Sequence, residues 1–162
     1  MNYQFTIQIA EEHIKYASSK FFFRNFKKAF LILGILGALI IVMYLQNRVI
    51  DGFIGGLMGI FAFFVLFLFF FYNALQKKPL ARLKKFGGTV NYELADEVCK
   101  IKSGWASTEI KWQAFQALWV YSKVWMLFSK DMGCFTFPVE QISNEVKEFL
   151  KQKIVSVGGK VK

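Results

Sequence analysis

Two long apolar segments, separated by six residues, constrain this chain more than any other feature of its sequence. The first runs from Ala29 to Leu45 and the second from Gly52 to Leu75, and neither contains a charged residue. A helix needs about 20 mostly apolar residues to cross a hydrocarbon core about 30 Å thick. The second segment reaches this length, and the first reaches it if its helix starts about one turn earlier. The sequence therefore predicts a transmembrane hairpin over residues 29–76, with helices at about 29–47 and 52–75.

Basic residues flank this hairpin on both sides and predict its orientation. Four precede it and five follow it: Lys20, Arg24, Lys27 and Lys28, then Lys77, Lys78, Arg82, Lys84 and Lys85. The turn holds Arg48 and Asp51, whose charges cancel. Because Lys and Arg are enriched in cytoplasmic loops, we expect both termini in the cytoplasm and the turn outside. A cleavable signal peptide fits poorly, because 28 residues precede the first segment and no A-x-A-like pattern follows it.

The formal net charge of +10 raises the question of a nucleic-acid partner. The basic residues crowd beside the membrane ends, however, so we expect those nine residues to contact anionic headgroups and expect no nucleic acid. Cys99 and Cys134 lie far apart without a C-x-x-C spacing, and we expect both to be buried packing residues. With a single histidine, His13, in the chain, we expect no metal site and no cofactor.

Small residues recur in both apolar segments at spacings that allow helices to approach closely. Gly52 with Gly56, and Gly55 with Gly59, have the small-xxx-small pattern. We expect the two helices to pack on each other at Gly34, Ala38, Gly52, Gly56 and Gly59, with Ala38 opposite Gly59. Homodimerisation through the same residues is the alternative. Neither segment contains an Asp, Glu, Lys, Arg or His residue, which argues against a transporter or pump.

The N-terminal region, residues 1–28, is predicted to hold a strand and a basic amphipathic helix. Residues Tyr3 to Ile9 alternate apolar and polar side chains, which indicates a half-buried strand. A strand of seven residues cannot bury itself alone, so we expect it to join a sheet built later in the chain; the alternative is that it lies flat on the membrane. Glu11 and Glu12 suit the first turn of a helix that continues into the membrane. We expect His13 to be a solvated surface residue.

Residues 77–88 form a basic juxtamembrane linker in this interpretation. Pro79 suits the first turn of a new helix, and Leu80, Leu83 and Phe86 recur at helical spacing. Gly87 and Gly88 would end it. The linker is therefore predicted to be a short amphipathic helix that contacts the cytoplasmic lipid surface.

From Thr89 onward the apolar period changes to two, which is typical of a small antiparallel sheet domain over residues 89–162. The predicted strands are 89–94, 98–103, 107–111, 115–121, 124–129 and 134–137. A final amphipathic helix is predicted from Val139 to Ile154. With the N-terminal strand this makes about seven strands, the size of a pleckstrin-homology-like barrel. The predicted fold class is a membrane α+β protein, with a transmembrane hairpin and a cytoplasmic sheet or barrel capped by a C-terminal helix.

The order of motifs in this region resembles the YcxB-like family of bacterial membrane proteins. The motifs are TVNYELADEVCKIKS, Ile110-Lys111-Trp112, Tyr121-Ser122-Lys123 and Phe135-Thr136-Phe137-Pro138, followed by a helix. With the preceding hairpin and basic segment, the resemblance covers nearly the whole chain. It implies a pleckstrin-homology-like domain anchored in the bacterial inner membrane, and it supplies no catalytic residues.

No sequence motif for catalysis is present: there is no Gly-rich phosphate loop, H-E-x-x-H or G-x-S-x-G. The four tryptophans are better explained by packing than by base stacking. Trp119 is expected in the core with Phe115, Ala117 and Tyr121, and Trp105 is expected at a partner or membrane surface. We therefore expect a non-enzymatic binding or regulatory module with a lipid and a protein partner. An immunity protein that neutralises a toxin or membrane-targeting effector is the alternative.

Overall fold

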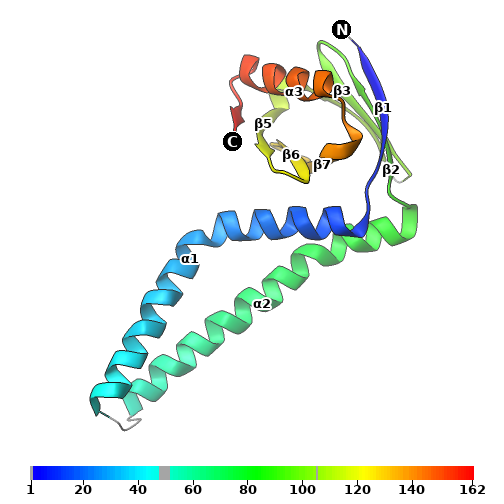
Figure 1. The fold of residues 1–162 in the computed structure, drawn as a ribbon. Helices are drawn as coiled ribbons and strands as arrows, with labels where there is room; N and C mark the ends of the chain where they lie inside the picture. The colour runs from blue at the N-terminus through cyan, green and yellow to red at the C-terminus, as the bar shows by residue number, and fades with distance from the viewer. Residues whose placement is uncertain (1, 48–51, 105) are drawn as a thin grey trace. The chain divides into compact units, whose positions relative to one another are not determined.

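The computed structural model describes residues 2–47, 52–104 and 106–162 (Figure 1). Trp105 and most of the predicted turn, residues 48–51, lie outside the described residues. The elements are β1 (Tyr3–Gln8), α1 (Glu11–Asn47), α2 (Gly52–Phe86), β2 (Thr89–Leu94), β3 (Val98–Ser103), β4 (Ala106–Lys111), η1 (Trp112–Ala114), β5 (Phe115–Val120), β6 (Val124–Ser129), β7 (Gly133–Pro138), η2 (Val139–Gln141), α3 (Asn144–Ser156) and β8 (Lys160–Val161). Internal contacts divide the chain into a sheet unit, Met1–Ala17 with Lys78–Lys162, and a hairpin unit, Ser18–Lys77.

The sheet unit contains two four-stranded sheets. The first has the strand order β1-β2-β3-β4 and is antiparallel, and the second has the order β7-β6-β5-β8. The second sheet is mixed, because the short β8 runs parallel to β5. All six strands predicted between residues 89 and 137 are present, each within one residue of its expected bounds. The α+β layout expected from the sequence is therefore confirmed.

The N-terminal strand belongs to the first sheet, as its alternating pattern predicted. β1 pairs antiparallel with β2 over six residue pairs, from Tyr3 opposite Leu94 to Gln8 opposite Thr89. Ile7 is fully buried in the core, whereas Gln4, Thr6 and Gln8 are exposed on the other face. The two strands are neighbours in space although the whole of α1 and α2 separates them in sequence. The hairpin unit is thus an insertion between the first two strands of a sheet.

Two glycines allow the chain to return from α2 into β2 beside β1. Gly87 has φ +75°, a conformation that other residues rarely adopt, and its N–H donates to the Leu83 carbonyl at the end of the helix. At Gly88, a Cβ would clash with the carbonyl oxygen of Ile9. The close approach lets the Ile9 N–H donate to the Gly88 carbonyl at 2.8 Å.

The core lies between the two sheets and under α3. The Tyr92 and Phe137 rings, from different sheets, have centroids 4.6 Å apart, and Tyr3 packs on Phe149 of α3 at 5.2 Å. Trp112 is 1% exposed, and its indole N–H donates to the Ala95 carbonyl at 2.8 Å. Two of the four tryptophans, Trp112 and Trp125, belong to this core.

The prediction for Trp119 was wrong because β5 contains an irregularity. The register between β5 and β6 shifts between Phe115 and Ala117, and such a bulge changes which side chains face the core. Phe115 and Leu118 are therefore the buried residues of this strand. Trp119 instead lies outside the core cluster and packs on Phe128, with ring centroids 4.3 Å apart and ring planes inclined by 48°.

The C-terminal helix begins later than predicted. Residues 139–141 form the 3₁₀ turn η2, and α3 starts after Ser143, whose hydroxyl accepts a hydrogen bond from the Val146 N–H at 3.3 Å. Serine is a favoured N-cap because its side chain satisfies an N–H that the first helical turn leaves free. Val146, Leu150 and Ile154 follow at helical spacing and are buried.

The linker helix expected after Pro79 is part of α2 rather than a separate element. α2 runs from Gly52 to Phe86 with Pro79 inside it. α1 likewise continues without interruption from Glu11 to Asn47. Each of these two helices contains a stretch that is long and apolar enough to cross a membrane.

The burial of Ile7 gives a direct stability test of the β1 assignment. We expect Ile7→Ala to lower the free energy of unfolding of the sheet unit by about 2–5 kcal/mol, because it opens a cavity in a core that includes both sheets. Gln4→Ala, on the exposed face of the same strand, should change it by less than about 0.5 kcal/mol. Urea unfolding of the full chain in detergent, followed by tryptophan fluorescence, measures both. Equal effects of the two variants would contradict the assignment.

Candidate functional site

The hairpin unit is held together by aromatic rings at the end that carries the basic residues. Phe22 of α1 packs on Tyr72 of α2 with ring centroids 5.2 Å apart, and Phe26 packs on Phe71 at 5.1 Å. Phe22 is 5% exposed although it lies on a helix whose apolar side chains are mostly exposed. These rings form the main described side-chain contact between the two helices at this end.

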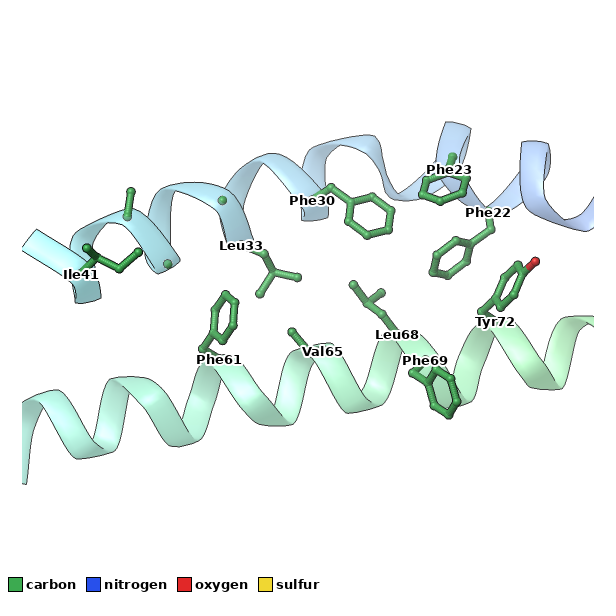
Figure 2. A pocket seen from close by; sticks show the side chains of 13 residues that line it. Phe22, Phe23, Phe30, Leu33, Ile41, Phe61, Val65, Leu68, Phe69 and Tyr72 are labelled. Atoms are coloured by element: carbon green, nitrogen blue, oxygen red, sulfur yellow. The ribbon is translucent and has the colours of Figure 1, made fainter.

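Beyond the rings the two helices enclose an apolar groove of about 800 Å³, which is the candidate site (Figure 2). Eight residues of α1 and five of α2 line it. Apart from the hydroxyl of Tyr72, the lining side chains carry no polar atom. Figure 2 shows Phe22, Phe23 and Tyr72 at one end of the groove and Ile41 with Phe61 at the other.

The small residues of α1 create the groove rather than closing it. Gly34, Gly37 and Ala38 line it, so at these three positions α1 presents no side chain larger than a methyl group. A Cβ added at Gly34 would meet nothing within 4 Å, whereas one at Gly37 would lie 3.4 Å from the Phe61 ring. Gly37 is therefore the glycine of α1 that approaches the opposite helix.

The predicted packing of the helices at Gly34, Gly52, Gly56 and Gly59 is not what the structure shows. A Cβ added at any of these four positions would have no heavy atom of the opposite helix within 4 Å. A Cβ at Gly59 would thus not touch Ala38, and neither Gly56 nor Gly59 lines the groove.

The nine basic residues predicted to contact lipid headgroups all lie on α1 and α2. Lys20 is half-buried and the other eight are exposed. Lys20, Arg24, Lys27, Lys28 and Lys77 belong to the hairpin unit. The remaining four belong to the last turns of α2 in the sheet unit: Lys78, Arg82, Lys84 and Lys85.

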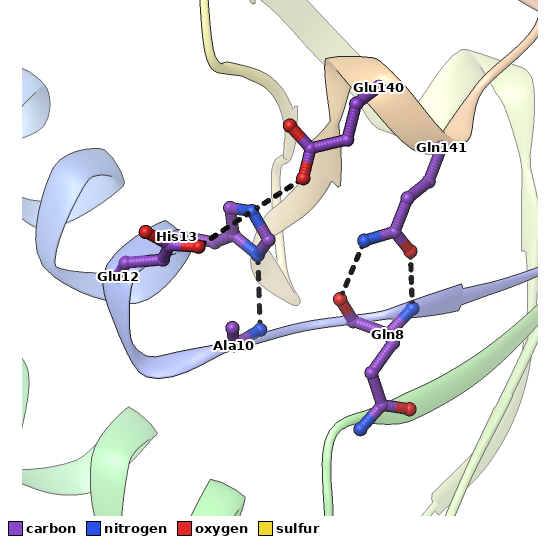
Figure 3. A network of polar contacts seen from close by, with 6 residues as sticks. All are labelled: Gln8, Ala10, Glu12, His13, Glu140 and Gln141. Atoms are coloured by element: carbon purple, nitrogen blue, oxygen red, sulfur yellow. Dashed lines mark hydrogen bonds and ion pairs between the residues drawn. The ribbon is translucent and has the colours of Figure 1, made fainter.

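A polar network fixes the first turn of α1 within the sheet unit (Figure 3). His13, expected to be solvated, is only 6% exposed. Its Nδ1 accepts a hydrogen bond from the Ala10 N–H at 3.0 Å, so the neutral ring carries its proton on Nε2. Nε2 then donates to Glu140 Oε1 at 3.2 Å. Sequence reasoning missed this role, although a polar side chain one turn into a helix is a plausible partner for a free N–H.

The end of β1 is fixed in the same region by a reciprocal amide pair. The Gln8 N–H donates to Gln141 Oε1 at 2.6 Å, and Gln141 Nε2 donates back to the Gln8 carbonyl at 3.0 Å. Gln141 and Glu140 both belong to η2, the turn that follows β7 of the second sheet. The last residue of β1 is therefore paired with β2 of the first sheet and also bonded to η2.

Burial and ion pairing shift the pKa values of several titratable groups of the sheet unit. Burial raises the pKa of the Cys99 thiol to about 12, and the thiol lies in the core as expected. Cys134, also expected to be buried, is exposed. The Lys15 ammonium, 2.6 Å from Glu11, lowers the pKa of that carboxyl. Within the described residues there is no group of three His, Cys, Asp or Glu side chains that could hold a metal ion.

Comparisons with protein-family models, with curated proteins and with solved structures give no match for this chain. The resemblance to the YcxB-like family stays a prediction from motif order. Two features then carry the functional argument: the apolar groove of the hairpin unit, and the bonded strands from which α1 and α2 depart.

Proposed function

We propose that this chain is a non-enzymatic binding module, anchored by its hairpin in a bacterial inner membrane, with a pleckstrin-homology-like domain at the cytoplasmic surface. The observation that carries the proposal is the hydrogen bond between Ile9 and Gly88, 2.8 Å long, which joins the two ends of the hairpin insertion. The layout of seven antiparallel strands followed by α3 supports the domain type. The motif order shared with the YcxB-like family supports it as well.

The bonded hairpin ends support a topology with both termini on one side of the membrane. α1 begins three residues after β1, and α2 ends three residues before β2. A chain whose two ends meet at Ile9 and Gly88 must return to the side that it left, which two membrane crossings achieve and one does not. The basic residues beside these ends support the cytoplasm as that side, because Lys and Arg are enriched in cytoplasmic loops.

The open edge of the first sheet is the surface we propose for a protein partner. Among the described residues, β4 has a strand neighbour on one side only, β3. An exposed strand edge offers unpaired N–H and C=O groups to which an extended segment can add. Ser107 and Glu109 of this strand are exposed, so side chains of an added segment would meet a polar surface.

Cysteine labelling tests the topology. In a chain with Cys134→Ser, the remaining native thiol of Cys99 is buried, and burial keeps it protonated. We expect Arg48→Cys in this background to react with a membrane-impermeant maleimide added to intact cells, and Lys160→Cys to react only after lysis. The reverse pattern would place the sheet unit outside and contradict the proposal.

Site-specific photo-crosslinking tests the binding surface. A photoreactive residue at position 107 should give a discrete adduct in membranes, because an added strand would lie about 4.8 Å from β4. The same residue at position 102 is a matched control, since Lys102 is the register partner of Ser107 on β3, one strand further from the edge. Equal crosslinking at both positions, or none at position 107, would show that this edge is not the binding surface.

A further inference from the structure

The groove of the hairpin unit has the length of one membrane leaflet. Its lining extends from Phe22 to Ile41 on α1 and from Phe61 to Tyr72 on α2. The eleven helical steps of the α2 lining, at about 1.5 Å each, give about 17 Å. Half of a hydrocarbon core about 30 Å thick is about 15 Å. The groove therefore matches the depth over which the acyl chain of one lipid extends.

The size and chemistry of the groove also fit a hydrocarbon chain. A methylene group is similar in size to a water molecule, whose share of liquid volume is about 30 Å³. A volume of about 800 Å³ thus holds on the order of 25 methylene groups. That is enough for one acyl chain with part of a second. Below Tyr72 the lining side chains carry no polar atom. The groove therefore offers van der Waals contacts to hydrocarbon and no side-chain hydrogen bond or ion pair to a polar ligand.

Basic side chains continue one line of the groove toward the membrane surface. Residues seven apart lie on the same helix face, shifted by only about 20°, and Lys20, Lys27, Gly34 and Ile41 have this spacing. Gly34 and Ile41 line the groove, and Lys27 is exposed two turns before Gly34. Lys28 is rotated by a further 100° or so, away from this face. Tyr72 supplies a hydroxyl at the same end of the groove (Figure 2).

The charge at this end favours a lipid over a second copy of the chain. A second hairpin in the groove would bring its own Lys20, Arg24, Lys27 and Lys28 beside those of the first, and like charges repel. No acidic residue lies between Glu12 and Asp51 to compensate them. An anionic phospholipid provides the opposite charge at the headgroup and hydrocarbon below it, in the order in which the hairpin presents its basic and apolar residues.

We propose that the groove between α1 and α2 binds an acyl chain of one anionic phospholipid, whose phosphate lies at Lys27. The inference rests on the proposed function, because it requires the hairpin to span the membrane. The acyl chain fills the space beside Gly34, Gly37 and Ala38, and the lipid is a structural part of the hairpin.

The test is a lipid titration of the full chain by native mass spectrometry in detergent, with phosphatidylglycerol and phosphatidylcholine of identical acyl chains. One juxtamembrane lysine contributes roughly a fivefold change in affinity for an anionic lipid surface. We expect the wild type to prefer phosphatidylglycerol, and Lys27→Gln to lose about fivefold in affinity for it. Lys28→Gln, with the same change of charge one residue away, should retain it.

A second pair of variants tests the groove itself. Gly34→Leu fills it, and Gly56→Leu adds the same side chain outside it; a Cβ meets open space at both positions, so both variants should fold. We expect Gly34→Leu to lose both lipids by at least tenfold and Gly56→Leu to bind as the wild type does.

Three results would overturn the inference. The first is equal affinity for the two lipids, and the second is an equal effect of the two variants within either pair. The third is a lipid-free dimer, or a complex with another protein, that Gly34→Leu dissociates, since a polypeptide would then occupy the groove. Alkaline extraction of membranes distinguishes failure of the lipid site from failure of the membrane anchor. A chain that stays in the membrane but does not discriminate between the two lipids contradicts only the lipid site. A chain that is extracted from the membrane contradicts the proposed function.

Discussion

The pairing of β1 with β2 is the interaction on which the rest of the structure depends. These strands stand on opposite sides of the hairpin insertion in sequence, yet they share six residue pairs and the Ile9–Gly88 hydrogen bond. The pairing buries Ile7 and brings Tyr3 and Phe5 onto the common core. It also fixes the start of α1 and the end of α2 at one place in the sheet unit. His13 and Gln8 reinforce this place through their bonds to η2.

The packing of the sheet unit follows the physics of burial in water, and that of the hairpin unit, if it spans a membrane as we propose, follows the physics of packing among lipids. In the sheet unit, burial of apolar side chains drives packing. The strands close around a core in which the buried indole N–H of Trp112 has a hydrogen-bond acceptor, the Ala95 carbonyl. Inside a bilayer, lipid tails are as apolar as the side chains, and helices gain little by excluding them. Phenylalanine-rich helices that meet through rings at one end can therefore leave a groove open to hydrocarbon. A bound lipid in that groove is the consequence we infer.

Periodicity alone predicted most of the fold, because strands and long apolar helices leave strong local signals. It could not predict the bulge near Phe115, because a register shift depends on β6, and so it placed Trp119 on the wrong face. It predicted a break at Pro79 that the continuous α2 does not contain. The glycine spacing indicated close helix packing, but a Cβ at Gly34, Gly52, Gly56 or Gly59 would have no atom of the opposite helix within 4 Å. His13 was missed because its partner Glu140 is 127 residues away.

Backbone hydrogen exchange at β1 in the full chain tests the central claim most directly. Bonded pairs alternate in antiparallel strands, so the Ile9–Gly88 bond places the N–H groups of Phe5 and Ile7 toward β2 as well. The account predicts that these two amides exchange as slowly as those in the middle of β6, and that a chain lacking residues 89–162 loses this protection. Exchange of both amides in the intact chain at the rate of an unstructured peptide would contradict it.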